Sequence, residues 1–142
     1  MRFASAAGTL PSIPTRRPAI TPLETARRAY GAATIGYGTY ALARPSHLAR
    51  QLGIDEHTAT RLGRAFGVRD VSHGLWLLSA RTRRSRTRAL QARVIIDVAD
   101  ALLCGMLAPH PAGRARGAGA ATGWATLASA LLIADRRAGR SR

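Results

Sequence analysis

The alternation of apolar and polar positions predicts four long helices, two of which carry charges at their centres. The first of these two lies in residues 63–78 (GRAFGVRDVSHGLWLL) and the second in residues 93–108 (RVIIDVADALLCGMLA). Apart from those charges, each stretch is apolar or small on most sides. A helix of this kind is buried in a protein interior or in a membrane. We expect both stretches to be inner helices of a bundle.

Small residues line one face of the first stretch. At 3.6 residues per turn, three glycines fall on one side of the helix: Gly63, Gly67 and Gly74. Because glycine has no side chain, a neighbouring helix can approach this face closely. A second GxxxG spacing, Gly119 and Gly123, lies in the last apolar stretch. All five are candidate helix-packing residues, and the GxxxG spacings are open to contacts within the bundle or to a dimer.

Charged side chains form one stripe on each of the two central helices. The stripes comprise Arg69, Asp70 and His73 on the first helix and Arg93, Asp97 and Asp100 on the second. A buried charge without a partner is strongly destabilising. We therefore predict that the stripes face each other, so that the two arginines neutralise some of the three carboxylates.

The same stripes are open to a chemical interpretation. Two carboxylates three residues apart that face a histidine have the donor types of a divalent metal site or of a proton relay. No Glu-x-x-His pair occurs, however, and the two arginines compete for the carboxylates. A structural salt-bridge network is therefore favoured, with no metal and no cofactor. A transporter-like or proton-relay element is the alternative.

The N-terminal part of the chain divides at Thr21. Residues 1–21 are rich in Ala, Ser, Thr and Pro and predict a disordered leader. Thr21 as the N-cap and Pro22 at the first helical position begin a long helix, with Glu24 placed for a capping box. This helix has an uncharged centre of Gly, Ala and Tyr, and it ends before Pro45.

Start and stop signals place the remaining elements. Residues 46–52 predict a short extra helix ended by Gly53, and Asp55 is the expected N-cap of the next helix. The run RTRRSRTR at 81–88 has five arginines and is expected to be a solvated connection. After a basic loop with Arg114 and Arg116, residues 117–134 lack any charge and form the best membrane-span candidate.

The expected fold is all-α, a four-helix membrane bundle with a short extra helix between helices one and two. It occupies residues 22–136, between the leader at 1–21 and a basic tail at 137–142. Cys104 is the only cysteine, which excludes an internal disulfide. The mean hydropathy of −0.05 is near neutral, so composition alone supports the membrane interpretation only weakly.

Charge indicates the partner and the orientation. The chain has 22 basic residues, all of them arginine, against 7 acidic ones, for a net charge of +15. This excess favours an anionic partner, either lipid head groups or nucleic acid. If four helices cross a bilayer, 14 arginines lie on the side of both termini and 6 on the other. The positive-inside rule then predicts a bacterial inner membrane protein with both termini in the cytoplasm.

A soluble DNA-binding protein is the sharpest alternative. Residues 48–62 fit a helix-turn-helix except at Ala59, where a branched apolar residue is expected. The residues that would face the major groove are Glu56, His57, Thr58, Thr60 and Arg61. The long Gly-rich apolar helices elsewhere in the chain argue against this interpretation. No catalytic motif occurs, so we expect no enzyme, and the sequence indicates no known small-molecule substrate.

The order of four features resembles a known family. They are a helix of small residues followed by the segments RPSHLARQLG, GVRDVSHGLWLL and RVIIDVADALL. Together they resemble small actinobacterial four-helix integral membrane proteins of unknown function, the DUF4267-like group, over residues 26–108. The most specific positions are Gly67, Arg69, Asp70, Gly74, Arg93, Asp97 and Asp100. The resemblance implies a membrane bundle, in which a homo-oligomer is an open possibility, and brings no activity with it.

Overall fold

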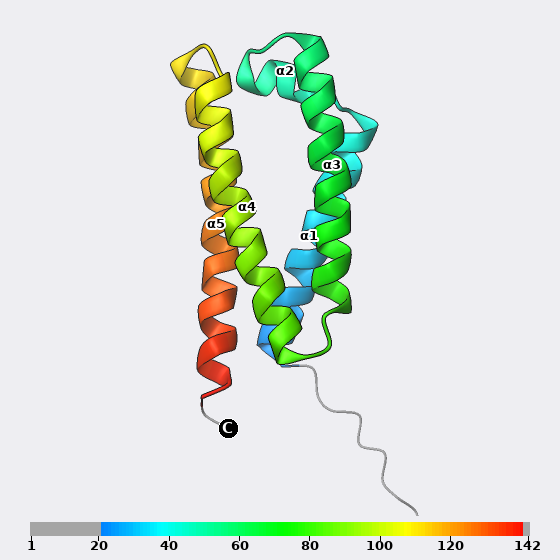
Figure 1. Cartoon of the computed structure of the whole chain (residues 1–142), viewed down its shortest axis with the longest axis vertical. Coiled ribbons are helices and arrows are strands. Elements are labelled where there is room, and N and C mark those ends of the chain that lie inside the picture. Colours follow the sequence, from blue (N-terminus) through cyan, green and yellow to red (C-terminus); the bar gives the residue numbers. More distant parts are fainter. Residues whose placement is uncertain (1–20, 141–142) are drawn as a thin grey trace, which may run out of the picture.

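The computed structural model describes residues 21–140, which form five α-helices and no strands. The helices are α1 (Pro22–Ala43), α2 (His47–Leu52), α3 (Glu56–Ser79), α4 (Arg83–Leu107) and α5 (Pro111–Ala138), as shown in Figure 1. The predicted fold class is confirmed: four long helices, with a short extra helix between the first two. The predicted leader, apart from Thr21, and the last two residues of the predicted tail lie outside the described residues.

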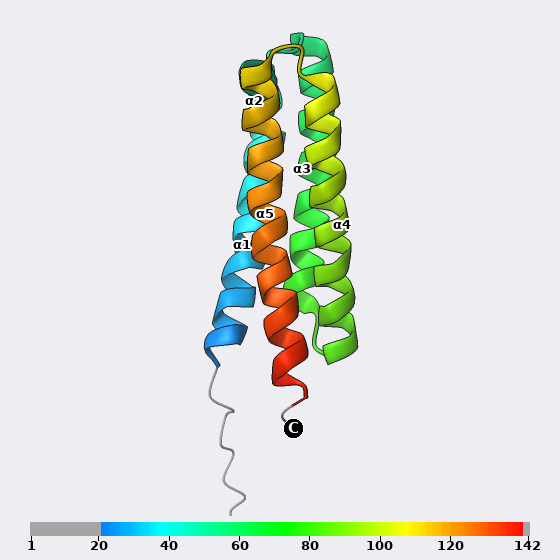
Figure 2. The same cartoon turned by 90° about the vertical axis from the view of Figure 1, so that its left-hand side faces the viewer.

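The four long helices form two antiparallel pairs. Helix α1 packs along α3, and α4 packs along α5, while α2 lies across one end and contacts α3 and α5 (Figures 1 and 2). The start of α1, the α3–α4 connection and the end of α5 lie together at the opposite end. We call this opposite end the Arg-rich end, because it carries ten of the 18 described arginines.

Glycines bring the backbones of α1 and α3 together. A Cβ at Gly38 would lie 2.7 Å from the backbone nitrogen of Val71 and 2.8 Å from the carbonyl oxygen of Gly67. A second close approach of α1 and α3 occurs further along, where a Cβ at Gly74 would lie 2.8 Å from the carbonyl oxygen of Gly31. The third glycine of this face, Gly63, lies against the backbone of Pro45. Any side chain at these positions would push the two helices apart.

The packing glycines of α5 are not the predicted ones. No atom lies within 4 Å of where a Cβ at Gly119 or Gly123 would stand, so a role in packing within the bundle is excluded for both. Gly117 instead packs against Leu52 and Cys104, and Gly113 packs against the backbone of Leu52. The buried positions of α5 begin with these two glycines. A GxxxG spacing does pack this helix, but one turn and a half earlier than predicted.

The helix starts follow the predicted caps at two positions. The Thr21 hydroxyl accepts a hydrogen bond from the backbone N–H of Glu24 at 3.3 Å, and the Asp55 carboxylate accepts one from the N–H of Thr58 at 2.9 Å. The Thr58 N–H holds the pKa of Asp55 below its ordinary value. Gly53 ends α2 with φ at +73°. The Glu24 carboxylate binds arginine side chains instead of completing a capping box.

Two predicted connections are helical. Only Ala80, Arg81 and Thr82 link α3 to α4, because the Thr82 hydroxyl accepts from the N–H of Ser85 at 3.1 Å and starts α4 at Arg83. The prediction of a solvated connection over 81–88 is therefore wrong for all but its first two residues. The predicted basic loop with Arg114 and Arg116 is wrong as well, since Pro111 occupies the first turn of α5.

Candidate functional site: a buried charge cluster between the helix pairs

The six charged and polar residues predicted for the two central helices lie where α3 faces α4, between the two helix pairs. The backbones of α3 and α4 make far fewer close approaches than those of α1 and α3, so long side chains fill the space between them. Five of the six form one continuous set of ion pairs, which we call the charge cluster: Arg69, Asp70, Arg93, Asp97 and Asp100.

Arg69 on α3 joins the cluster to the middle of α4. Its two terminal nitrogens donate to the two carboxylate oxygens of Asp100, each at 2.7 Å. Its Nε and Nη2 also donate to Oδ1 of the neighbouring Asp70, at 3.0 and 2.9 Å. The paired geometry with Asp100 uses the flat guanidinium fork, which lysine lacks. The Arg69 side chain remains 29% exposed, so the cluster reaches the surface at this residue.

Arg93 on α4 forms the buried half of the cluster. It donates to both oxygens of Asp97, one turn along the same helix, at 2.7 and 3.0 Å. It also donates to Oδ1 of Asp70 on α3 at 2.8 Å. All three side chains are nearly inaccessible, at 3% for Arg93 and 1% for each carboxylate. Asp70 thus accepts from both arginines and is the centre of the cluster.

Aromatic rings cover the two guanidinium groups. The Arg93 guanidinium lies 5.7 Å from the centre of the Trp124 ring on α5, and that of Arg69 lies 4.7 Å from the Phe66 ring on α3. Trp124 also meets the ring of Tyr30 on α1 edge to face, with 5.3 Å between the ring centres. All four long helices therefore contribute to the cluster or its cover.

The sixth predicted residue, His73, lies buried on α3 but outside the set of ion pairs. Its side chain stacks edge to face with Trp76, with 5.6 Å between the ring centres. Its Nε2 is the one buried side-chain nitrogen or oxygen in residues 21–140 that has no hydrogen-bond partner. The two stripes face each other as predicted, but His73 lies beside the cluster without a hydrogen bond or ion pair to it.

A small cavity adjoins the cluster. Its volume is about 80 Å³, and its walls include Asp70, Arg93, Asp97 and Asp100. Tyr37, Gln51 and Cys104 line it toward the α2 end of the bundle. A space of this size holds a few water molecules among polar partners. Among the described residues, no three His, Cys, Asp or Glu side chains converge as a metal site would require.

The sequence analysis missed two ion-pair groups at the Arg-rich end. Glu24 accepts from Arg27 and Arg28, each at 2.7 Å, and Asp135 pairs with Arg86 at 3.5 Å. The hydrogen bond from Arg27 is the main reason why the pKa of Glu24 lies below its ordinary value. The sequence does indicate the first group, because Glu24 lies three residues before Arg27 and four before Arg28 on one helix.

Comparison with known proteins gives one match. A family model described as a domain of unknown function, DUF4267, matches residues 31–134, which is well over half of the chain. The match runs from the middle of α1 to near the end of α5 and contains the whole charge cluster. It therefore includes most of α5, which lies outside the residues 26–108 that carried the resemblance. No curated protein and no solved structure matches the chain.

Proposed function

We propose that this chain, which belongs to the DUF4267 family of unknown function, is an integral membrane protein whose four long helices cross the bilayer. In this proposal the charge cluster is a structural element that holds the two helix pairs together inside the membrane. The observation that carries the proposal is a largely apolar band of surface around the middle of the bundle, which we call the apolar belt. The cluster reaches this band at Arg69 and Asp100, whose side chains are 29% and 14% exposed.

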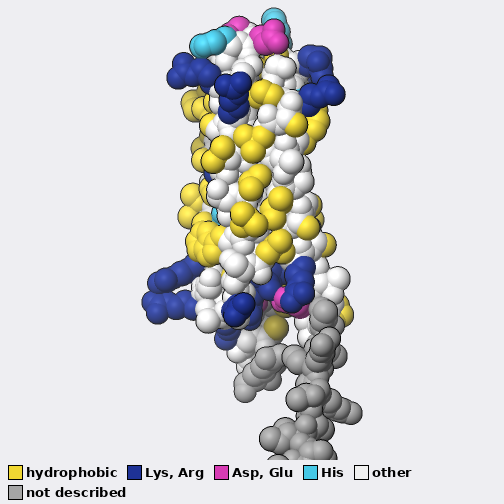
Figure 3. Space-filling model, turned by 90° about the vertical axis from the view of Figure 1, so that its right-hand side faces the viewer, with side chains coloured by type: hydrophobic (Ala, Val, Ile, Leu, Met, Phe, Trp, Pro, Cys, Tyr) yellow, Lys and Arg dark blue, Asp and Glu magenta, His cyan; other side chains and the backbone are white. Residues whose placement is uncertain are grey.

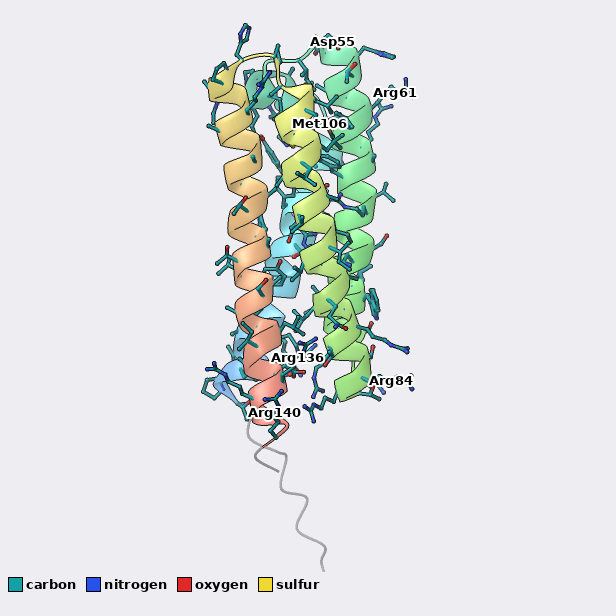
Figure 4. All side chains as sticks on the ribbon, turned by 60° about the vertical axis from the view of Figure 1, so that its left-hand side comes forward. Asp55, Arg61, Arg84, Met106, Arg136 and Arg140 are labelled. Atoms are coloured by element: carbon teal, nitrogen blue, oxygen red, sulfur yellow. The ribbon has the colours of Figure 1, made fainter. Side chains whose placement is uncertain are left out.

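The apolar belt is bounded by charges at both ends of the molecule. In residues 21–140, the only charged side chains between the two ends are the five of the cluster. Figure 4 shows Asp55 and Arg61 at one end and Arg84, Arg136 and Arg140 at the other, and Figure 3 shows hydrophobic side chains across the middle of one face. Large apolar residues are exposed on all four long helices, among them Leu42, Leu75, Leu102 and Leu127.

The height of the belt fits a bilayer. No charge separates Arg28 from Arg44 on α1, or Arg116 from Asp135 on α5. At a rise of 1.5 Å per residue these segments are about 24 and 28 Å long. The hydrocarbon core of a bilayer is about 30 Å thick. Flanking arginines can extend their charged ends toward the head groups and make up the difference.

Helix α5 supports the proposal, although weakly by itself. It is the one described helix that is long and apolar enough to cross a membrane by length and composition. The core helix of a soluble protein can satisfy the same test, but it would be mostly buried, and only 17% of the apolar window of α5 is buried. Helices α3 and α4 carry the cluster at their centres, and membrane helices accept such charges where they pair in the interior.

The arginines suggest an orientation. The Arg-rich end holds ten described arginines and the α2 end holds six. The positive-inside rule favours the cytoplasmic side for the Arg-rich end. The start of α1 and the end of α5 both lie there (Figure 1), so we propose that both termini face the cytoplasm of a bacterial inner membrane.

Cysteine labelling tests this arrangement directly. The single native cysteine is buried, so Cys104→Ala gives a background without reactive thiols. Three exposed positions then receive a cysteine in turn: His57→Cys at the α2 end, Val98→Cys in the belt and Arg84→Cys at the Arg-rich end. In intact cells a membrane-impermeant maleimide should label only the first. Permeabilisation should add the third, and Val98→Cys should stay unlabelled until detergent is added. Equal labelling of all three in a detergent-free lysate would contradict the proposal.

A proton-relay or transporter-like role is the second candidate, and the cavity beside the cluster is the observation that favours it. The cavity is large enough to hold water, and the three carboxylates of the cluster line it in the centre of the belt. The test is proton flux into liposomes that contain the purified protein. A relay predicts a flux that Asp100→Asn abolishes while the helical content stays unchanged. A structural cluster predicts no flux above that of empty liposomes for either protein.

DNA binding remains the third candidate and now has less support. Glu56, His57 and Arg61 are exposed at the α2 end, as that interpretation requires. The helix that would enter the major groove, however, is only the start of the 24-residue helix α3, which runs on through the belt. Large apolar side chains on the outer face of all four long helices would be unusual for a soluble protein.

A further inference from the structure

A groove opens at the Arg-rich end, outside the charge cluster. It lies between the start of α1, the α3–α4 connection and the end of α5, and its volume is about 970 Å³. Five arginines line it: Arg27, Arg28, Arg81, Arg83 and Arg86. Glu24 and Asp135 are the two acidic residues in its walls, so the lining has a net charge of +3, which is five minus two.

The arginines of the groove differ in how far they are neutralised. Arg27 and Arg28 share the single carboxylate of Glu24, and Arg86 pairs with Asp135. Arg83 donates to the carbonyl oxygens of Gly139 and Arg136, at 3.1 and 3.3 Å, which carry no full charge. The exposed side chain of Arg81 has no ion pair with any residue in 21–140. The uncompensated positive charge therefore concentrates around Arg81 and Arg83.

The groove also has apolar residues in its lining. Leu23, Leu78 and Leu131 come from α1, α3 and α5 and are at least partly exposed, whereas Leu90 of α4 is fully buried. The groove lies at the edge of the apolar belt, which ends at Arg28 on α1 and at Asp135 on α5. A ligand that fits this lining has a negative head among arginines and a hydrocarbon part along leucines. Basic pockets between membrane helices on the cytoplasmic side bind anionic phospholipid head groups.

We propose that this groove binds an anionic phospholipid, with its phosphate among Arg28, Arg81 and Arg83 and an acyl chain along Leu23, Leu78 and Leu131. The inference rests on the proposed membrane location. It goes beyond general attraction to a charged surface, because it assigns the lipid to one side of the Arg-rich end. Arginines that lie outside the groove at the same end should contribute much less to binding.

The chain offers a matched control for this test. The groove variant combines Arg28→Gln with Arg81→Gln, and the control variant combines Arg84→Gln with Arg88→Gln. All four arginines are exposed, and each pair of substitutions removes the same charge, but neither Arg84 nor Arg88 lines the groove. The full-length protein in detergent is titrated with cardiolipin, and bound lipid is measured by native mass spectrometry. Phosphatidylcholine and inorganic pyrophosphate serve as the zwitterionic and lipid-free probes.

We expect the groove variant to bind cardiolipin more weakly by on the order of tenfold, and the control variant by less than threefold. Equal losses in the two variants would overturn the site. Competition by pyrophosphate at concentrations similar to cardiolipin would show a soluble-anion site and overturn the lipid assignment. A carbonate wash of membranes with both variants separates the two proposals: if both stay in the pellet and bind lipid equally, only the groove is wrong, whereas release of both refutes the membrane location.

Discussion

At the residue scale, one carboxylate holds the cluster together. Asp70 Oδ1 accepts from Arg69 and from Arg93, and the contact with Arg93 crosses from α3 to α4. Asp97 pairs with Arg93 within α4, so it adds no link between the helix pairs. The cluster contains three carboxylates and two guanidinium groups. Loss of Asp97 therefore leaves the two arginines balanced by Asp70 and Asp100.

This arrangement predicts an order of stability losses. Asp70→Asn should lower the free energy of unfolding by about 3–5 kcal/mol, because it removes the carboxylate shared by the buried Arg93 and the partly exposed Arg69. Asp97→Asn should cost less, and Arg84→Ala, at an exposed position, should cost nothing measurable. Unfolding by SDS in mixed micelles, followed by circular dichroism, measures all three. An Asp70→Asn protein as stable as Arg84→Ala would show that the cluster does not hold the fold.

Sequence reasoning identified the residues of the cluster but not its connections. That Arg69 and Arg93 meet carboxylates follows from the cost of an unpaired buried charge. Which carboxylate the two arginines share depends on how α3 is rotated about its axis relative to α4. The helical period of the sequence does not determine that rotation. His73 shows the limit, because it lies on the same predicted stripe as Arg69 and Asp70 but stays outside the ion pairs, and its Nε2 has no hydrogen-bond partner.

At the element scale, contacts between backbones bind α1 to α3, and contacts between side chains bind the pairs to each other. Gly38 and Gly31 were not predicted as packing residues, because a small residue shows its role only when the facing helix is known. The glycines of α3 were predicted from their shared face, and Gly67 and Gly74 do lie against α1. On α5 the pair that packs within the bundle was not predicted, since Arg114 and Arg116 made Gly113 and Gly117 look like part of a loop.

The contact between α1 and α3 predicts a difference between two neighbouring glycines. A Cβ at Gly38 would meet backbone atoms of α3 below 3 Å, whereas one at Gly36 would meet nothing within 4 Å. Gly38→Ala should therefore lower stability by about 1–3 kcal/mol through strain. Gly36→Ala should leave stability unchanged or raise it by up to about 1 kcal/mol. Thermal unfolding in detergent micelles compares them, and equal midpoints would refute the close approach.

Helix α5 allows a parallel test that also addresses self-association. Gly117→Leu should destabilise the fold, because Leu52 and Cys104 occupy the space, and Gly119→Leu should leave the fold intact. If Gly119 and Gly123 serve contact with a second copy, Gly119→Leu should also reduce the fraction of dimer that a cross-linker captures in membranes. Destabilisation by Gly119→Leu to the extent of Gly117→Leu would show that this face packs within one chain.

At the scale of the whole molecule, the surface and the interior are both unusual for a soluble bundle. The exposed middle is apolar, with Ile95 at 69% and Val98 at 49% exposed, while the interior holds the charged residues Asp70, Arg93 and Asp97. The sequence predicted the number and order of the helices because charges, prolines and caps mark their ends. It did not predict the pairing of α1 with α3 and of α4 with α5, because hydropathy does not record which helices are neighbours.

The most direct test of the central claim is fractionation of the expressed full-length protein with an alkaline carbonate wash of the membranes. The account predicts that the protein stays in the pellet through the wash and enters solution only when detergent is added, because four apolar helices remain in the bilayer. Release by carbonate or by high salt alone would contradict it. In that case the arginines would hold the protein to an anionic surface, and the apolar belt would need a protein partner.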